Sequence, residues 1–111
     1  MSDAVGQVFA ALADPTRRSV VQRLLQERTT TVPELTAVLP MTRQAVAKHL
    51  ATLDSAGLVE RAPGSGRQVT YRLRPGALSP ALTWIRDAES AWDGRLARLR
   101  DAVERGSSAA R

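Results

Sequence analysis

The sequence contains no cysteine and only one histidine, His49. Disulfide bonds, thiolate metal sites and cysteine nucleophiles are therefore excluded, and so is a zinc site built from cysteine and histidine. Aromatic residues are also scarce, since Phe9, Tyr71, Trp84 and Trp92 are the only ones. We therefore expect a core built from Leu, Val and Ala.

The sequence also lacks a long apolar run, and residues 1–13 carry no basic residue. Signal peptides and membrane spans need these features, so we expect no membrane partner and a cytoplasmic location. A length of 111 residues suits one domain. We assign residues 1–105 to that domain and expect residues 106–111 to form a disordered tail.

Basic residues exceed acidic residues by 16 to 11, which gives a formal net charge of +5. Residues 41–75 hold six basic and two acidic residues, so this segment alone contributes +4. A concentrated positive charge predicts an anionic partner for that segment, as in binding driven by counterion release from nucleic acid.

Apolar spacing predicts two helices in the first part of the chain. Residues 5–12 have apolar side chains at i, i+3, i+4 and i+7, the pattern of a short amphipathic helix. Asp14 and Pro15 then suit the cap and first position of a second helix, which we expect to end near Glu27. Residues 20–25 supply its apolar stripe, and residues 29–31 are interpreted as a loop.

A third and a fourth helix follow with a short break between them. Thr31–Glu34 is a capping box that opens the third helix. The Pro40-Met41 break separates it from the fourth helix, which Thr42 can cap and Gly57 can end. This is the spacing of a helix-turn-helix, whose second helix enters the major groove of DNA.

The repeat of the apolar side chains then changes from about 3.6 residues, as in a helix, to 2 residues, as in a strand, which predicts a β-hairpin. We expect strands at residues 58–62 and 68–74, joined by a flexible tip at residues 63–67. A long helix follows from about Ser79 to Glu104. The predicted fold is therefore mainly α with a small β-hairpin wing, a winged helix-turn-helix.

The fourth helix presents a polar or small face that suits base contacts. Arg43 can bond guanine through two hydrogen bonds and Gln44 can bond adenine, while the small Ala47 allows close approach and Lys48 adds charge. Arg67 at the hairpin tip can reach a minor groove or a phosphate. Two alternatives remain open: a merely solvated helix face, and a winged helix that binds another protein.

The long helix carries a heptad-like apolar stripe that a domain of this size cannot cover. We predict that it joins two copies of the chain, with the first helix as its companion, although packing on the chain's own core is the alternative. Acidic residues on this helix have arginines at helical spacing, so we interpret them as surface ion pairs rather than metal ligands. The expected interface residues are Val5, Phe9, Leu82, Ile85, Trp92, Leu96 and Leu99.

Several segments together resemble the ArsR/SmtB-type winged helix-turn-helix repressors. They are the opening motif at residues 9–18, the helix at residues 42–50, Ala56–Val59, and the hairpin residues Gly66-Arg67 and 71–73. The resemblance covers about residues 5–100. It implies a homodimer joined by its first and last helices that binds double-stranded operator DNA and, in sensing members, releases it when a ligand or metal binds.

The resemblance also implies roles for single residues. Thr42, Arg43, Gln44, Lys48 and His49 match positions of the recognition helix, and Arg67 matches the wing. Arg17 matches an arginine that is either structural or phosphate-facing. Ala47 departs from the pattern, since many relatives carry serine there. His49 lies at the edge of the apolar face of its helix, so we expect it to be partly buried.

Metal sensors of this family use cysteines on the first or third helix, or histidine with acidic residues on the last helix. This sequence has neither, so it resembles the metal-independent subgroup, whose members are often autorepressors, and we expect no cofactor. We also find no nucleophile elbow and no phosphate-binding glycine loop, so we do not expect an enzyme. The operator sequence and the small-molecule inducer are not readable from the residues.

Overall fold

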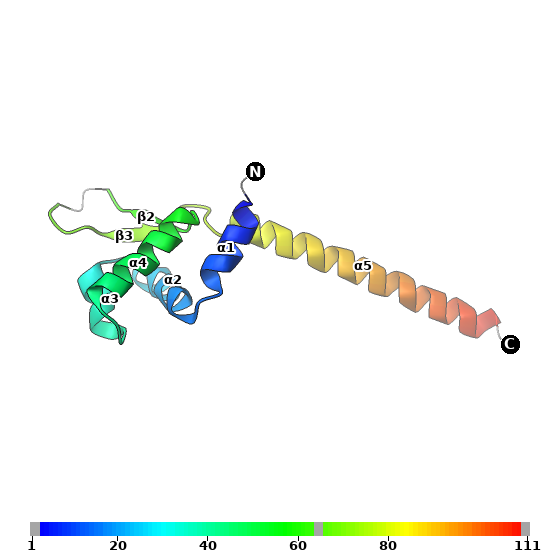
Figure 1. The fold of residues 1–111 in the computed structure, drawn as a ribbon. Helices are drawn as coiled ribbons and strands as arrows, with labels where there is room; N and C mark the ends of the chain where they lie inside the picture. The colour runs from blue at the N-terminus through cyan, green and yellow to red at the C-terminus, as the bar shows by residue number, and fades with distance from the viewer. Residues whose placement is uncertain (1–2, 64–65, 110–111) are drawn as a thin grey trace. The chain divides into compact units, whose positions relative to one another are not determined.

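The computed structural model describes residues 3–63 and 66–109. It divides into two compact units, residues 1–80 and residues 81–111. The first unit holds four helices and a small sheet, and the second consists of most of the long helix α5 (Figure 1). The predicted fold class, mainly α with a small sheet, is confirmed.

Helices α1 (Ala4–Leu12) and α2 (Pro15–Glu27) begin where their caps predict. The carboxylate of Asp3 accepts the backbone N–H of Gly6 at 2.8 Å, and that of Asp14 accepts the N–H of Arg17 at 2.9 Å. Each carboxylate satisfies a backbone donor that a helix start leaves unpaired, which stabilises the helix.

Helices α3 (Val32–Val38) and α4 (Arg43–Ser55) are each capped by a threonine. The hydroxyl of Thr31 accepts the N–H of Glu34 at 3.2 Å, and that of Thr42 accepts the N–H of Ala45 at 3.1 Å. After α4 the chain turns at Gly57, whose φ of 78° is a left-handed conformation that glycine adopts without strain.

The sheet contains one strand more than the predicted hairpin. Strands β2 (Val59–Arg61) and β3 (Tyr71–Leu73) pair antiparallel as expected, and β1 (Thr29–Thr30) pairs antiparallel with the other edge of β3. The prediction of a loop over residues 29–31 is therefore wrong for β1. A two-residue strand is too short to show a period, although β-branched threonine suits a strand.

The core of the first unit consists of Leu, Val and Ala, as the shortage of aromatics predicts. One side chain of the stripe predicted over residues 20–25 lies outside it, since Leu25 is 62% exposed, and Val38 of α3 is 58% exposed as well. At 100° per residue, Val20, Val21 and Leu24 lie on one side of α2, and Leu25 lies beyond the edge of that side. The fully or nearly fully buried apolar residues of α2, α3, α4 and β2 are Val20, Val21, Leu24, Leu35, Val46, Leu50, Leu53 and Val59.

Helix α5 (Ser79–Ala109) continues beyond its predicted end near Glu104. Arginine, alanine and serine all tolerate a helix, and one glycine costs only about 1 kcal/mol, so Gly106 does not stop it. Residues 110–111 of the expected tail lie outside the described residues. In the described ranges, no helix combines the length and the apolar character needed to cross a membrane.

Candidate nucleic-acid interface

A tight turn between α3 and α4 sets the two helices against each other (Figure 1). The N–H of Leu39 donates to the carbonyl of Leu35 at 2.9 Å and closes α3. The N–H of Met41 then donates to the carbonyl of Leu39 at 2.8 Å, and α4 begins two residues later. The break predicted at Pro40-Met41 is thus present, and it gives the two helices the arrangement of a helix-turn-helix.

Helix α4 is buried along one side and open along the other. Val46 and Leu53 are fully buried, and Leu50 is nearly so. Because these three fix the inner side, the residues predicted to contact bases lie outward at the N-terminal half of the helix. Arg43, Gln44, Ala47 and Lys48 are all exposed.

Thr42 lies exposed at the start of this face and caps α4. Its oxygen accepts the N–H of Ala45, but a hydroxyl that accepts one hydrogen bond can still donate another. The same side chain can therefore cap the helix and donate to an anion at the helix N-terminus, where the helix dipole favours negative charge.

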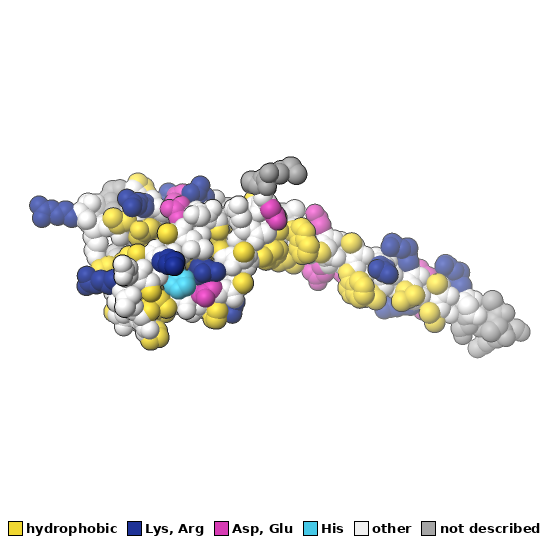
Figure 2. Space-filling model, in the orientation of Figure 1, with side chains coloured by type: hydrophobic (Ala, Val, Ile, Leu, Met, Phe, Trp, Pro, Cys, Tyr) yellow, Lys and Arg dark blue, Asp and Glu magenta, His cyan; other side chains and the backbone are white. Residues whose placement is uncertain are grey.

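His49 is half-buried, as predicted, and faces the start of α2. Figure 2 shows the histidine beside Lys or Arg side chains and a carboxylate on the face in view. The pKa of Asp14 lies below its ordinary value, chiefly because the carboxylate accepts the backbone N–H of Arg17. Desolvation opposes this shift, whereas the charges of Arg17 and His49 reinforce it. Within the part of the chain that is described, no three histidine or acidic side chains gather closely enough to hold a metal ion.

Arg17 bonds to the end of α1. Its Nε donates to the carbonyl of Ala11 at 2.6 Å, and its Nη2 donates to the carbonyl of Ala10 at 3.2 Å. The neighbouring Arg18 donates in the same way to the carbonyl of Leu12 at 2.7 Å. Of the two roles left open for Arg17, these bonds support the structural one, because they join α2 to the end of α1, where the last carbonyls lack partners within the helix.

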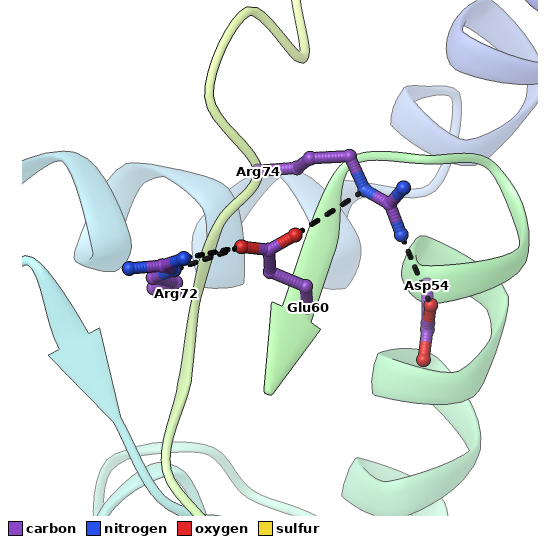
Figure 3. A network of polar contacts seen from close by, with 4 residues as sticks. All are labelled: Asp54, Glu60, Arg72 and Arg74. Atoms are coloured by element: carbon purple, nitrogen blue, oxygen red, sulfur yellow. Dashed lines mark hydrogen bonds and ion pairs between the residues drawn. The ribbon is translucent and has the colours of Figure 1, made fainter. Parts of the chain in front are cut away.

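A network of charged side chains ties the hairpin of β2 and β3, the wing, to the end of α4 (Figure 3). Arg72 donates from Nε and Nη2 to Oε2 of Glu60, at 2.9 and 2.7 Å. Nε of Arg74 lies 3.7 Å from Oε1 of the same glutamate, and its Nη2 lies 3.9 Å from Oδ1 of Asp54. These two arginines are therefore paired with carboxylates of their own chain, while their side chains stay 40% and 49% exposed.

The other four cations of residues 41–75 form no ion pair with any described residue, and all four are exposed. They lie on the outer face of α4 and in the wing. Arg67 follows Gly66, whose φ of 66° turns the chain, while Gly64 and Ser65 of the predicted tip lie outside the described residues. The four are Arg43, Lys48, Arg61 and Arg67.

Arg61 is a candidate contact that the sequence reasoning did not single out. It ends β2 next to Glu60, whose carboxylate faces Arg72 and Arg74. Successive residues of a strand point to opposite faces, so the alternation Glu60-Arg61 was the signal that one charge would be paired and the other not.

The expected dimer residues are open on the surface of this single chain. Leu82, Ile85 and Leu96 are between 42% and 45% exposed, and Trp92 and Leu99 more so. Phe9 is exposed and Val5 is half-buried. The predicted ion pairs along α5 are wrong, because no acidic and basic side chains described on this helix lie within 4.0 Å of each other. Exposed pairs at helical spacing gain only about 0.5 kcal/mol or less, too little to fix two long side chains.

The chain is similar to known helix-turn-helix regulators. A helix-turn-helix domain profile matches residues 12–62. An uncharacterized HTH-type transcriptional regulator of Bacillus subtilis, YuzN, is 42% identical over 72 residues, which are 60% of this chain and 74% of the relative. The HTH-type transcriptional regulator Rv2034 of Mycobacterium tuberculosis is 42% identical over 77 residues, 69% of this chain and 70% of the relative. An ArsR-like transcriptional regulator from Rhodococcus sp. RHA1 superposes with a TM-score of 0.76 at 35% identity, covering 88% of this chain and 91% of that one.

Proposed function

The chain belongs to the ArsR/SmtB family of winged helix-turn-helix transcriptional regulators, and from this premise we propose that it is a dimeric repressor of a palindromic operator. It is a DNA-binding regulator and not an enzyme. The observation that carries the finer proposal is the set of unpaired cations on the outer face of α4 and in the wing. An array of this kind matches the phosphates of duplex DNA.

In this proposal α4 lies in the major groove with its N-terminal half toward the bases. Arg43 bonds a guanine through two hydrogen bonds, and Gln44 bonds an adenine. The methyl group of Ala47 permits close approach, while Lys48, His49 and Thr42 contact the phosphate backbone. The buried side of α4 supports this role, because it holds the helix in one orientation.

The wing contributes charge rather than base readout. Arg67 and Arg61 reach phosphates or the adjacent minor groove. The position of the wing supports this role, because β2, whose Val59 is fully buried, packs against α4 and pairs antiparallel with β3. A positioned wing loses less conformational entropy on binding than a free loop.

Two copies of the chain bind together, so that two α4 helices meet successive major grooves roughly 34 Å apart. The exposed apolar residues of α5 and α1 support a dimer, because a stripe of this size is costly to leave in water. We also propose that the repressor acts in the cytoplasm, on its own promoter among others.

We further propose that operator binding needs no metal. The chain has no cysteine, and its one histidine lies on α4, where its charge helps to lower the pKa of Asp14. Carboxylates alone make a weak site for zinc, which prefers nitrogen and sulfur ligands.

The test compares the DNA upstream of the chain's own gene with random DNA at about 150 mM salt, where non-specific binding is weak. We expect preferential binding, a footprint over an inverted repeat, and a dimer by sedimentation at micromolar concentration. Equal binding to the upstream DNA and to random DNA would overturn the proposal of a repressor. Sedimentation as a monomer would overturn the proposal of a dimer. A protein partner whose binding survives charge reversal at Arg43, Lys48 and Arg67 would instead identify a protein-interaction module.

A further inference from the structure

An open cavity of about 290 Å³ lies between α1, the start of α2 and the end of α4. All the residues that line it belong to the first unit, and those on α4 lie in its C-terminal half, away from the proposed base contacts. Ala10, Ala11 and Ala56 line it with methyl groups, which leave space that larger side chains would fill. Small-molecule sites commonly measure about 300–1,000 Å³, so this cavity is of a size for a small ligand.

Among the described residues that line the cavity, Arg17 alone is charged, and its side chain is held in place. Its Nε and Nη2 donate to the carbonyls of Ala11 and Ala10, and these two bonds fix the plane of the guanidinium. No described carboxylate lies within 4.0 Å of it, since Asp14 accepts the backbone N–H of Arg17 instead. Its Nη1 bonds to no described residue and is not buried, because no buried side-chain nitrogen or oxygen of the described residues lacks a partner. The cavity therefore contains an oriented cation with unused N–H groups.

Three neutral polar residues line the same cavity. Gln7 and Ser55 are exposed, and a side-chain amide or hydroxyl can donate a hydrogen bond to a ligand. The hydroxyl of Thr52 already donates to the carbonyl of Lys48 at 3.1 Å, so it is left as an acceptor. With Arg17, donors therefore outnumber acceptors around the cavity, which favours a ligand that carries acceptor atoms and negative charge.

We propose that this cavity binds a small apolar carboxylic acid in its anionic form. The carboxylate accepts hydrogen bonds from the free N–H groups of Arg17, and the apolar body lies against the three alanines. Charge complementarity selects this class of ligand, because hydrogen bonds between arginine and a carboxylate are stronger than those between neutral groups. A cationic ligand would be repelled by Arg17, and an inorganic anion would leave the methyl groups uncovered.

The position of the cavity couples this ligand to DNA. It lies between α1, which belongs to the proposed dimer contact, and α4, which carries the proposed base contacts. A ligand that fills it fixes α4 relative to α1 and so changes the spacing of the two α4 helices in a dimer. Successive major grooves lie roughly 34 Å apart, so a changed spacing weakens operator binding. The carboxylic acid thus releases the operator. This effect rests on the proposed function, whereas the binding site does not.

Calorimetric titration of the full chain with 2-naphthoate, in the absence of DNA, tests the site itself. We expect saturable binding of one molecule per chain, and binding at least about tenfold weaker for 2-naphthamide, which has the same shape and no charge. Arg17→Gln should raise the dissociation constant of 2-naphthoate about tenfold. Arg18→Gln is the matched control, because Arg18 also bonds carbonyls at the end of α1 but does not line the cavity. Thermal unfolding of both variants establishes that they fold.

A second variant closes the cavity and leaves Arg17 untouched. Ala10 is exposed on α1, and leucine also favours a helix, so Ala10→Leu should fold and occupy the space with its side chain. We expect it to abolish the binding of 2-naphthoate. Ala4→Leu makes the same change at an exposed position of α1 that does not line the cavity, and it should keep the wild-type dissociation constant.

Several results would overturn the proposal. They are no saturable binding of 2-naphthoate at millimolar concentration, equal binding of the acid and the amide, and equal losses in Arg17→Gln and Arg18→Gln. Operator affinity is then measured by anisotropy with and without saturating 2-naphthoate, and we expect the ligand to weaken it at least about fivefold. Unchanged operator affinity with the ligand bound overturns the release of the operator alone. Normal ligand binding by a chain that shows no operator preference even without ligand overturns the repressor alone.

Discussion

At the scale of single residues, the proposed DNA contact depends on which cations are paired inside the protein. Arg72 and Arg74 are held by Glu60 and Asp54, whereas the cations on α4 and at Arg67 are exposed and have no carboxylate within 4.0 Å among the described residues. Charge that is already neutralised releases few counterions from DNA, so the unpaired cations should dominate the salt dependence of binding.

The side chains that we assign to base contacts should control sequence preference. We expect Arg43→Ala and Gln44→Ala each to reduce the discrimination between operator and random DNA by about 1–3 kcal/mol, because each removes a two-hydrogen-bond contact with one base. Fluorescence anisotropy with both DNAs measures this. Gln26→Ala, an exposed glutamine on α2, should leave discrimination unchanged. An equal loss of affinity for both DNAs would instead indicate that the two side chains contact phosphates.

The wing arginine should act on both DNAs equally. We expect Arg67→Ala to weaken binding to operator DNA and to random DNA to the same extent. The slope of log K against log salt should become less steep by about 1, since one phosphate contact is lost. Binding titrations at several salt concentrations give the slope. Arg105→Ala near the end of α5 is the matched charge deletion and should keep the wild-type slope. A loss confined to the operator would place Arg67 at a base.

Asp14 should make the stability of the chain depend on pH. Its folded pKa lies below the ordinary value of 3.8, mainly through the bond from the N–H of Arg17. A lowered folded pKa stabilises the fold above the unfolded pKa, and this contribution is lost as the pH falls through the folded pKa. Asparagine also caps helices but carries no charge. We therefore expect the melting temperatures of wild type and Asp14→Asn to converge between about pH 5 and pH 2, as thermal unfolding followed by circular dichroism can show. A constant difference would contradict this assignment.

At the scale of elements, the two sides of α4 have separate tasks. The inner side packs against α2, α3 and β2, and the outer side carries the proposed contacts. The wing is held in a comparable way, because its Glu60 pairs with arginines while Arg61 beside it stays exposed. Mutations on the two sides of α4 should therefore separate stability from DNA binding.

The replacement of a buried leucine and of an exposed leucine should have different effects on the free energy of unfolding. We expect Leu53→Ala to lower the free energy of unfolding by about 2–5 kcal/mol, because Leu53 is fully buried and its removal leaves a cavity. Leu25→Ala, at a leucine that is 62% exposed, should cost less than about 1 kcal/mol. Urea denaturation measures both. Equal losses would mean that Leu25 is covered in the folded protein, for example by a second copy.

At the scale of the whole molecule, the sequence joins an N-terminal part with no net charge, a strongly basic middle and a long helix with an exposed apolar stripe. Residues 1–40 contain four basic and four acidic residues, so the basic excess of residues 41–75 is local. This distribution fits a regulator that binds DNA through α4 and the wing and binds its own copy through α5. In the assembly that we propose, neither contact needs a metal.

Chelation should therefore leave the regulator active. We expect the operator affinity to stay within about twofold of its value, well under 1 kcal/mol, when EDTA is added or when zinc is supplied at micromolar concentration. Anisotropy titrations of metal-stripped protein provide the measurement, with a dialysed untreated sample as the control. Release of the operator by zinc would show a metal response that the donor set of this chain does not suggest.

The sequence by itself determined the helices and the outward face of α4. Asp14, Thr31 and Thr42 cap helices through bonds to residues three positions on, and the apolar side of α4 follows from its own spacing. These interactions are local, so a short window of sequence contains them in full.

Only the tertiary structure decided what depends on residues far apart in the chain. It paired Thr29 with Arg72 to form β1, placed Glu60 and Asp54 against the two arginines that they neutralise, and turned Arg17 to the end of α1. It also left Leu25 outside the core and the charges of α5 unpaired. Such outcomes depend on which surfaces meet once the chain has folded, and no local pattern of residues contains that information.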